Sequence, residues 1–302
     1  MVESVQFIIL FIVTSMGTMG DGGKPTGVWM EEVTTPYYEF KDAGYEVVVA
    51  SPEGGVMPID PRSMEGRGIT WSVKRYQDDE QAQAVFANTV KLDDVVGNDY
   101  SAVFLPGGHG PMWDLANNQQ VGMIVVQHYA LGKPVAAVCH GPAGLLTATD
   151  DYGGWIFRDK EVTGFTNAEE AAVGLTDEMP FLLEDKLVEL GGKFVRVEKF
   201  QPNVIVDGNL ITGQNPASAA ITAEAVIAHL GEYNIILKSF GGNKIATIKA
   251  IREITGLGPR EGKDIGDNAP AAVVEGVNLR RAIEIEKKLK AAGATVELKA
   301  SK

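Results

Sequence analysis

The chain has 302 residues, of which 45% are hydrophobic and 8% aromatic, and its formal net charge is −13 at pH 7. This composition excludes global disorder, and the length predicts one large domain with a smaller second one. The sequence contains one cysteine, which excludes an intramolecular disulfide and is typical of a reducing compartment. We therefore expect a cytoplasmic protein.

The chain begins with an apolar run at residues 5–13 that is interrupted only by Gln6. This run is far shorter than the roughly 20 residues that a membrane span needs. Glu3 also stands where a signal peptide carries positive charge. We expect a buried strand here and no membrane partner.

Strand-like and helix-like segments alternate beyond this run, which is typical of βα units. We predict an α/β fold with a flavodoxin-like parallel sheet that is sandwiched between helices. In such sheets, ligands bind beyond the carboxyl ends of the strands. The predicted strands are 5–13, 45–50, 101–105, 134–138 and 194–197, and the predicted helices are 36–43, 80–88, 119–131, 142–149, 180–190 and an Ala-rich one ending near residue 230.

The strand at 134–138 runs directly into Cys139, His140, Gly141 and Pro142. A strand, a sharp turn and a helix form a nucleophile elbow, in which a strained turn exposes one reactive side chain. A helix N-terminus lowers the pKa of a thiol, so we expect the pKa of Cys139 to lie below its usual value. A free cysteine can equally be a small buried hydrophobe, and the elbow alone leaves both interpretations open.

Two other predicted strand ends carry polar or glycine-rich segments. A glycine-rich loop at 20–27 precedes Trp29, Glu31 and Glu32. Adjacent carboxylates are commonly a solvated pair, but a carboxyl held near a thiol has a raised pKa and can donate a hydrogen bond to the thiolate. The strand at 101–105 ends in a turn containing Gly107 and Gly108, whose backbone N–H groups could form an oxyanion hole or belong to a plain turn.

The charge balance changes sign near Gly231. Residues 1–231 contain 14 basic and 31 acidic side chains, whereas residues 232–302 contain 13 and 9. We take this change as a domain boundary, with domains at 1–231 and 232–302. The second domain is predicted to be a small α+β unit with strands at 233–238 and 294–298 and helices at 244–254, 260–266 and 281–292.

Residues 1–230 resemble the PfpI-like superfamily, which has the class I glutamine amidotransferase-like fold, and within it the branch of heat-shock chaperones and cofactor-independent glyoxalases (glyoxalase III). The resemblance spans the whole segment, and its motifs are specific when taken together. They are Thr26-Gly27 with Glu32, Leu105 to Gly110, Val138 to Pro142, Thr163 to Asn167, and Thr212 to Ser218.

The resemblance implies a role for each residue that matches the family pattern. Cys139 would be the nucleophile, His140 the proton shuttle, and Glu32 the carboxyl against the sulfur. Glu32 is preferred to Glu31 because it fits the family spacing Thr-Gly-x4-Glu-x3-Pro, although Thr35 stands where the family often has histidine. The backbone of Gly108 and of His140 would form the oxyanion hole, and Gly107, Trp29 and Asn167 would contact substrate.

The function implied by this resemblance is a cofactor-independent glyoxalase that converts methylglyoxal-type 2-oxoaldehydes to 2-hydroxy acids. Deglycase or chaperone activity is also implied for the family, and a cysteine peptidase is an alternative on the same nucleophile. Glutamine amidotransfer is disfavoured because no His-x-Glu pair occurs in the sequence. We expect no cofactor and no metal, since neither His109 nor His128 belongs to a ligand-like cluster. We also expect a homo-oligomer and no direct contact with nucleic acid.

Residues 233–299 resemble the C-terminal domain of the bacterial ribosomal stalk protein, which docks translation factors. The matching segments are 243–252, 255–258, Glu261, 263–264 and 269–270. Pro259, Gly262 and Gly266 depart from the pattern, and we expect them to weaken the second helix. A non-enzymatic alternative is therefore a module that binds a translation factor or the ribosome. Its factor-docking residues would be Lys244, Ile245, Ile248, Lys249, Arg252 and Lys263.

Overall fold

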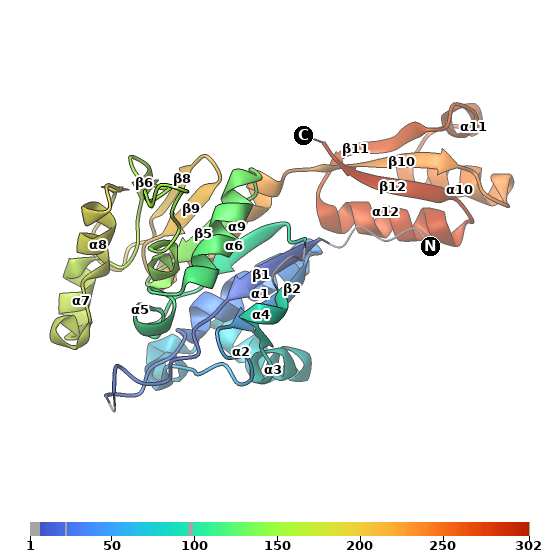
Figure 1. Ribbon diagram of the computed structural model, residues 1–302. Coiled ribbons are helices and arrows are strands. Elements are labelled where there is room, and N and C mark those ends of the chain that lie inside the picture. The colour runs from blue at the N-terminus through green and yellow to red at the C-terminus, as the bar shows by residue number, and fades with distance from the viewer. Residues whose placement is uncertain (1–6, 22, 96–98, 302) are drawn as a thin grey trace. The chain divides into compact units, whose positions relative to one another are not determined.

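The computed structural model describes residues 7–21, 23–95 and 99–301 and divides into two compact units (Figure 1). The first comprises Phe7–Lys41 and Glu46–His229, and the second contains the residues from Leu230 onward. Each unit has its own sheet. The two are described separately below.

The first unit is built on a seven-stranded sheet with the order β3-β2-β1-β4-β5-β9-β8. Its five central strands, β2-β1-β4-β5-β9, pair in parallel and have the predicted flavodoxin-like order. The sheet is mixed rather than wholly parallel, because the short turn between β8 and β9 can join them only as an antiparallel hairpin. The strands are β1 Ile8–Ile12, β2 Glu46–Ser51, β3 Val90–Lys91, β4 Ala102–Leu105, β5 Val135–Val138, β8 Val204–Asp207 and β9 Leu210–Gly213.

Side chains alternate between the two faces of this sheet, and both faces are buried. On one face Leu10 belongs to the same buried cluster as Val121 and Val125 of α6, Gln119–Ala130. On the other face Phe11 packs at 5.8 Å between ring centroids against Phe40 of α1, Met30–Ala43. Burial on both faces explains why the central strands are continuous apolar runs rather than alternating ones.

The apolar run near the N-terminus forms the central strand β1 over Ile8–Ile12, as expected for a buried strand. The part of the predicted 5–13 strand at residues 5 and 6 lies outside the described residues. Within the described ranges, no helix combines the length and the apolar character that crossing a membrane requires.

Two helices near the site differ from the predictions. Helix α1 begins at Met30, six residues before the predicted start, so that Pro36 lies inside it and Glu32 lies in its first turn. The predicted helix 142–149 is only a short 3-10 helix, η3, at Gly141–Leu145. Gly141 lies so close to β4 that an added Cβ would be 2.0 Å from the Leu105 carbonyl oxygen.

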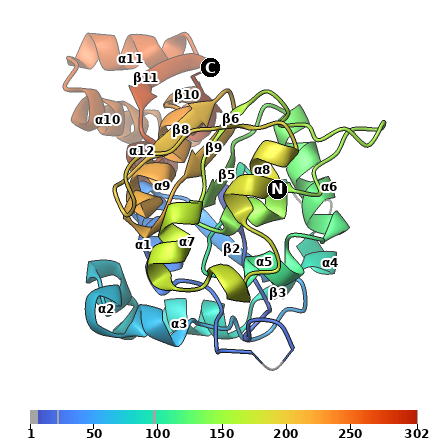
Figure 2. The same cartoon turned by 90° about the vertical axis from the view of Figure 1, so that its left-hand side faces the viewer.

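The remaining helices connect the strands, and α2 and α3 lie together at one end of this unit (Figure 2). The α-helices are α2 Trp71–Gln77, α3 Glu80–Ala87, α4 Leu92–Val95, α5 Pro111–Asp114, α7 Asn167–Val173, α8 Leu183–Glu189 and α9 Ala219–Leu230. The other 3-10 helices are η1 Pro61–Met64, η2 Gly66–Gly68, η4 Thr176–Glu178 and η5 Pro216–Ser218. A separate pair of short strands is β6 Glu161–Val162 and β7 Lys193–Phe194.

The second unit is an antiparallel three-stranded sheet with three helices. The strand order is β11-β10-β12, and β11 was missed by the sequence analysis. The unit is α+β, as predicted, with the order β-α-α-β-α-β. Its elements are β10 Tyr233–Ser239, α10 Lys244–Thr255, α11 Pro259–Asp267, β11 Ala271–Val277, α12 Leu279–Ala291 and β12 Thr295–Ala300.

Helix α11 forms over the whole predicted range despite its proline and glycines. Pro259 occupies the first helical position, where its missing N–H costs no hydrogen bond. A Cβ on Gly266 would lie 1.7 Å from Phe240 Cζ, and one on Gly262 would lie 2.9 Å from Arg252 Cγ. Each glycine therefore accommodates a bulky neighbour, and Phe240 fills the space that a side chain at 266 would take.

The contact between Phe240 and Gly266 gives a stability prediction. We expect Phe240→Ala and Gly266→Val each to destabilise the C-terminal unit by about 1–4 kcal/mol, the first through a cavity and the second through overpacking. In the double variant the valine fills the cavity, so the combined loss should be smaller than the sum. Hydrogen exchange of residues 259–267 in the full chain measures this. Ile245→Ala, at a side chain that is 83% exposed, is the control, and additive losses would contradict the pairing.

Candidate active site

The turn after β5 has the strained geometry of the predicted elbow. Cys139 has a φ of 59°, a left-handed conformation that is unfavourable for a residue with a side chain. Its backbone is held from two sides, since Cys139 N donates to the Gly213 carbonyl at 2.9 Å and Phe165 N donates to the Cys139 carbonyl at 2.8 Å. The neighbouring strand and loop therefore fix the position of the thiol.

The elbow opens into a cavity of about 340 Å³. Four residues singled out from the sequence line it together, namely Trp29, Glu32, Gly108 and Cys139. The others were not predicted, and most of them are apolar. They are Arg62, His109, Phe165, Val173, Phe200 and Pro216.

Cys139, His140 and Glu170 form a hydrogen-bonded chain. Cys139 Sγ lies 3.4 Å from His140 Nδ1, and His140 Nε2 lies 2.7 Å from Glu170 Oε2. Glu170 is near the start of α7, whose capping box between Thr166 and Glu169 fixes the first turn. The arrangement is that of a nucleophile, a base and an acid that orients the base.

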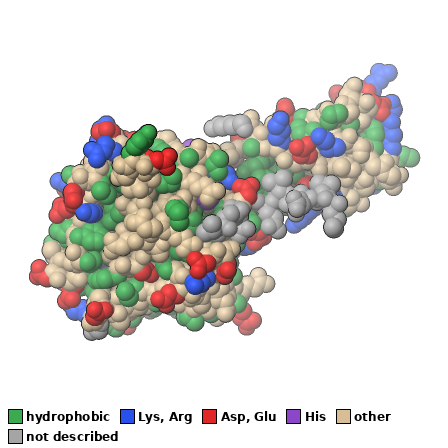
Figure 3. Space-filling model, viewed as in Figure 1, with side chains coloured by type: hydrophobic (Ala, Val, Ile, Leu, Met, Phe, Trp, Pro, Cys, Tyr) green, Lys and Arg blue, Asp and Glu red, His purple; other side chains and the backbone are tan. Residues whose placement is uncertain are grey.

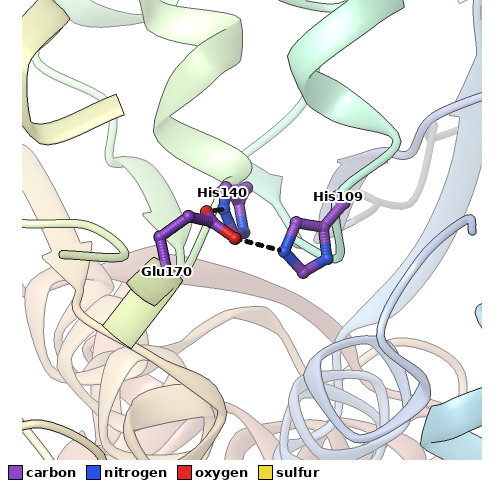
Figure 4. A group of neighbouring side chains, drawn as sticks. All are labelled: His109, His140 and Glu170. Atoms are coloured by element: carbon purple, nitrogen blue, oxygen red, sulfur yellow. Dashed lines mark hydrogen bonds and ion pairs between the residues drawn. The ribbon is translucent and has the colours of Figure 1, made fainter. Parts of the chain in front are cut away.

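Glu170 was not predicted, although it lies three residues beyond the family motif Thr163 to Asn167. It shares its carboxylate between two histidines, because its other oxygen, Oε1, lies 3.0 Å from His109 Nε2 (Figure 4). Burial alone would raise the pKa of Glu170, but the hydrogen bonds from His109 and His140 outweigh burial and lower it to about 2. Glu170 is therefore ionised at neutral pH.

His109 is buried and was also given no role by the sequence analysis. Burial and the charge of His140 lower its pKa to about 4, against the opposing effect of Glu170. His109 is consequently neutral at pH 7. The sequence signal was its place in the Gly107-Gly108-His109 turn, which we considered only for its backbone.

Glu32 is fully buried in α1, and its Oε2 accepts a hydrogen bond from Gly107 N at 2.9 Å. Oε1 has no hydrogen bond among the described residues, and burial raises the pKa of the carboxyl well above its usual range. Burial therefore favours the protonated form of Glu32. The carboxyl also interacts with the neighbouring Cys139 thiol, so Glu32 and Cys139 influence each other's protonation.

The expected low pKa of Cys139 is wrong. Burial raises the pKa of the thiol well above its usual value, and the Glu32 carboxyl raises it further. The predicted helix that should have lowered it is only the five-residue η3. The thiol is thus protonated at rest, and His140 Nδ1 is the atom placed to accept its proton.

The remaining predicted site residues lie as follows. A Cβ on Gly107 would be 2.5 Å from Glu32 Oε2, and one on Gly108 would be 2.3 Å from the Gly27 carbonyl oxygen, so both positions exclude side chains. Trp29 Nε1 is buried and has no hydrogen-bond partner among the described residues. Asn167 does not line the cavity, since its Nδ2 donates to Asp185 at 2.7 Å.

His109, His140 and Glu170 also bring their donor atoms within 4.8 Å of one another, which is close enough to hold a metal ion. We had placed His109 outside any such cluster, and the structure corrects this. Both histidine Nε2 atoms are already engaged by Glu170, so we interpret the group as a hydrogen-bonded network. His128 is remote from it and bonds the Ile124 carbonyl through Nδ1.

The predicted factor-docking residues lie on α10 and α11 of the second unit, where Lys and Arg side chains are visible on the surface (Figure 3). Ile245 is strongly exposed, whereas Ile248 is partly buried. Lys244 and Lys263 both pair with Asp267, at 2.6 and 2.5 Å. The six residues therefore differ in how much of their charge or apolar surface is free.

Comparison with known proteins agrees with both resemblances inferred from the sequence. Residues 233–299 match the ribosomal protein L7/L12 C-terminal domain. Glyoxalase 3 of Candida albicans is 34% identical over 229 residues, covering 73% of this chain and 97% of that protein. Glutathione-independent glyoxalase hsp3102 of Schizosaccharomyces pombe is 33% identical over 220 residues, covering 69% and 90%.

Comparison of the fold with solved structures identifies the same kind of relative as comparison of the sequence. The crystal structure of glyoxalase III from Candida albicans matches with a TM-score of 0.69 at 31% identity, covering 74% of this chain and 97% of that one. Residues 26–229 match the family model described as DJ-1/PfpI. The chain belongs to the DJ-1/PfpI family, with a ribosomal protein L7/L12 C-terminal domain following it.

Proposed function

We propose that the N-terminal unit is a glutathione-independent glyoxalase that converts 2-oxoaldehydes of the methylglyoxal type to 2-hydroxy acids. The observation that carries this proposal is the hydrogen-bonded chain from Cys139 through His140 to Glu170, whose thiol end lines a cavity together with Glu32, a carboxyl of raised pKa. The names of the two glyoxalase relatives support this reaction over the peptidase alternative.

The first step is addition of the sulfur to the aldehyde carbon. His140 Nδ1 takes the thiol proton as Cys139 Sγ attacks, and the ionised Glu170 stabilises the imidazolium that forms. The aldehyde oxygen then takes this proton from the imidazolium and becomes the hydroxyl of a hemithioacetal, which leaves His140 neutral for the next step. The backbone N–H groups of Gly108 and His140 are the donors we assign to it.

The second step moves one proton between two carbons. His140 removes the proton from the former aldehyde carbon and returns it to the neighbouring carbonyl carbon, through an enediol. We assign to Glu32, which lines the cavity, the exchange of a proton with an oxygen of this intermediate. The product of the step is a thioester, and water hydrolyses it to the 2-hydroxy acid and the free thiol, so that one aldehyde and one water give one hydroxy acid.

Turnover measurements test whether Cys139 and His140 act together in the same catalytic steps. We expect Cys139→Ala and His140→Ala each to remove nearly all formation of lactate from methylglyoxal, measured without glutathione, while the fold is retained. The double variant should be little slower than either single one, because residues that act as one unit do not lose activity additively. Clearly additive losses would show that the two side chains act in separate steps.

Glu32 offers a second test with a matched control beside it. Glu32→Gln keeps an acceptor for Gly107 N but cannot exchange the carboxyl proton, so we expect turnover to fall by about 10²–10⁴-fold. Glu31→Gln should be nearly silent, since Glu31 does not line the cavity even though burial raises its pKa to about 7. The opposite ranking of the two variants in the lactate assay would show that Glu31 is the functional carboxyl.

We further propose that residues 232–302 form a separate domain that binds a translation factor or the ribosome. The match to the ribosomal protein L7/L12 C-terminal domain supports this, as does the excess of basic residues in this segment. Lys249 lies 4.0 Å from Glu253, and no ion pair of Arg252 occurs among the described residues. These two cations are thus the least neutralised of the predicted docking set. A cytoplasmic location and self-association stay predictions.

The docking proposal predicts a charge-dependent interaction. Lys249→Glu with Arg252→Glu in the full chain should reduce binding to a translational GTPase by about tenfold or more, since reversed charges repel an acidic partner. The lactate assay should be unaffected, because neither residue belongs to the catalytic unit. Lys299→Glu on β12 is the matched control. Unchanged binding of the double variant, or no binding by the unaltered chain, would contradict the proposal.

A further inference from the structure

Arg62 hydrogen-bonds His109 at the ring nitrogen that Glu170 does not contact. Its Nη2 lies 3.3 Å from His109 Nδ1. A guanidinium has only donors, so His109 Nδ1 must be the acceptor and must carry no proton. The ring proton therefore resides on Nε2, which donates to Glu170 Oε1 at 3.0 Å.

Arg62 is anchored although its side chain is 41% exposed. Its Nε donates to Asp60 Oδ1 at 2.9 Å and its Nη2 donates to Asp60 Oδ2 at 2.5 Å, which is a bidentate pair. Asp60 is fully buried and also accepts hydrogen bonds from Arg62 N and Thr26 Oγ1. The guanidinium is thus presented to His109 in a fixed orientation.

We propose that Arg62 is a positioning residue that holds His109 as the neutral Nε2–H tautomer, so that the charge of Glu170 remains available to His140. The inference rests on the proposed roles of Cys139 and His140. It assigns a task to two side chains, Arg62 and His109, that the reaction steps above do not use.

The geometry explains why a neutral His109 matters. The rings of His109 and His140 are 4.3 Å apart between centroids, and one carboxylate serves both. A protonated His109 would neutralise Glu170 and repel the imidazolium that His140 becomes when it accepts the thiol proton. The charged or titratable groups that face His109 are Arg62, Glu170 and His140, with Asp60 behind Arg62.

The electrostatic effects on His109 agree with this role. Burial lowers its pKa most, the charges of His140 and Arg62 also lower it, and Glu170 acts in the opposite direction. Removing the arginine should therefore raise the pKa of His109. Above this pKa the ring stays neutral, and below it the ring gains a second proton, on Nδ1.

Imidazole ¹⁵N shifts of the full chain test the tautomer without any need for turnover. In the unaltered protein we expect His109 to remain the neutral Nε2–H form from pH 8 down to pH 6. In Asp60→Asn with Arg62→Met, which removes the buried partner charge together with the guanidinium, His109 should gain a proton at a higher pH than in the unaltered protein, as the pH is lowered further towards 4. The ¹⁵N signals that disappear in His109→Gln are those of His109. A His109 that has the same shifts in both proteins, or the Nδ1–H form in the unaltered one, would overturn the proposal.

Turnover then measures the consequence for His140. Relative to the unaltered protein, the Asp60→Asn, Arg62→Met protein should lose increasingly more kcat as the pH falls from 8 towards the pKa of its His109, reaching about tenfold once that ring is mostly protonated. Arg62→Lys keeps a cation and a hydrogen-bond donor, so this variant should retain part of the lost kcat. Arg67→Met, at a neighbouring exposed arginine, is the matched control. In a His109→Gln background there is no ring to protonate, so the same substitutions should cause no pH-dependent loss. A pH-independent loss would mean that Arg62 acts only structurally.

If the unaltered protein shows no turnover, the glyoxalase proposal fails. The nitrogen shifts still decide the tautomer in that case. Failure of the glyoxalase proposal can therefore be distinguished from failure of the proposal about Arg62 and His109.

Discussion

Glu170 is buried with a full negative charge, and the arrangement of the cavity follows from the groups that stabilise this charge. A buried carboxylate is stable only when it is well hydrogen-bonded, and here two imidazole N–H groups serve its two oxygens. Each of these bonds places the proton of one ring on Nε2. The bare nitrogen of His140 is consequently the one that faces Cys139, and the bare nitrogen of His109 is the one that faces Arg62. One charge thus sets the protonation of both rings.

Glu32 lines the cavity, and its pKa is shifted in the opposite direction to that of Glu170. It receives one backbone hydrogen bond and no imidazole, so burial dominates and its pKa rises, whereas that of Glu170 falls to about 2. Two buried carboxyls on either side of Cys139 and His140 therefore have pKa values shifted in opposite directions, which favours a proton on Glu32 and a charge on Glu170. This difference does not depend on the residue type. It depends on which element each carboxyl comes from and which donors that element meets.

The sequence predicts features whose cause is local. The apolar strand, Cys139 and the glycine at 141 are adjacent, so the elbow and its lone thiol are visible in seven residues. Glu170 is 31 residues beyond Cys139, and only the packing of α7 against the elbow brings the two together, which no spacing rule reveals. The direction of the pKa shift of Cys139 was wrong for the same reason. A helix end can be inferred from neighbouring residues, but the burial of the thiol and its contact with Glu32 cannot. The strand β11 was missed because the alanines and glycine of Ala271–Val277 give no clear strand pattern.

The C-terminal unit shows how exposure changes the weight of the same interactions. The pairs of Asp267 with Lys244 and Lys263 lie at the surface, where water screens them and each contributes about 0–1 kcal/mol. Such pairs can be exchanged for contacts with an acidic partner at little cost. Asp60, in contrast, is fully buried and cannot lose the half-exposed Arg62 without leaving a buried carboxylate without its ion-pair partner. Surface charge in this unit is thus suited to reversible recognition. Buried charge in the N-terminal unit is suited to fixing proton positions, and the two sets of side chains can vary independently.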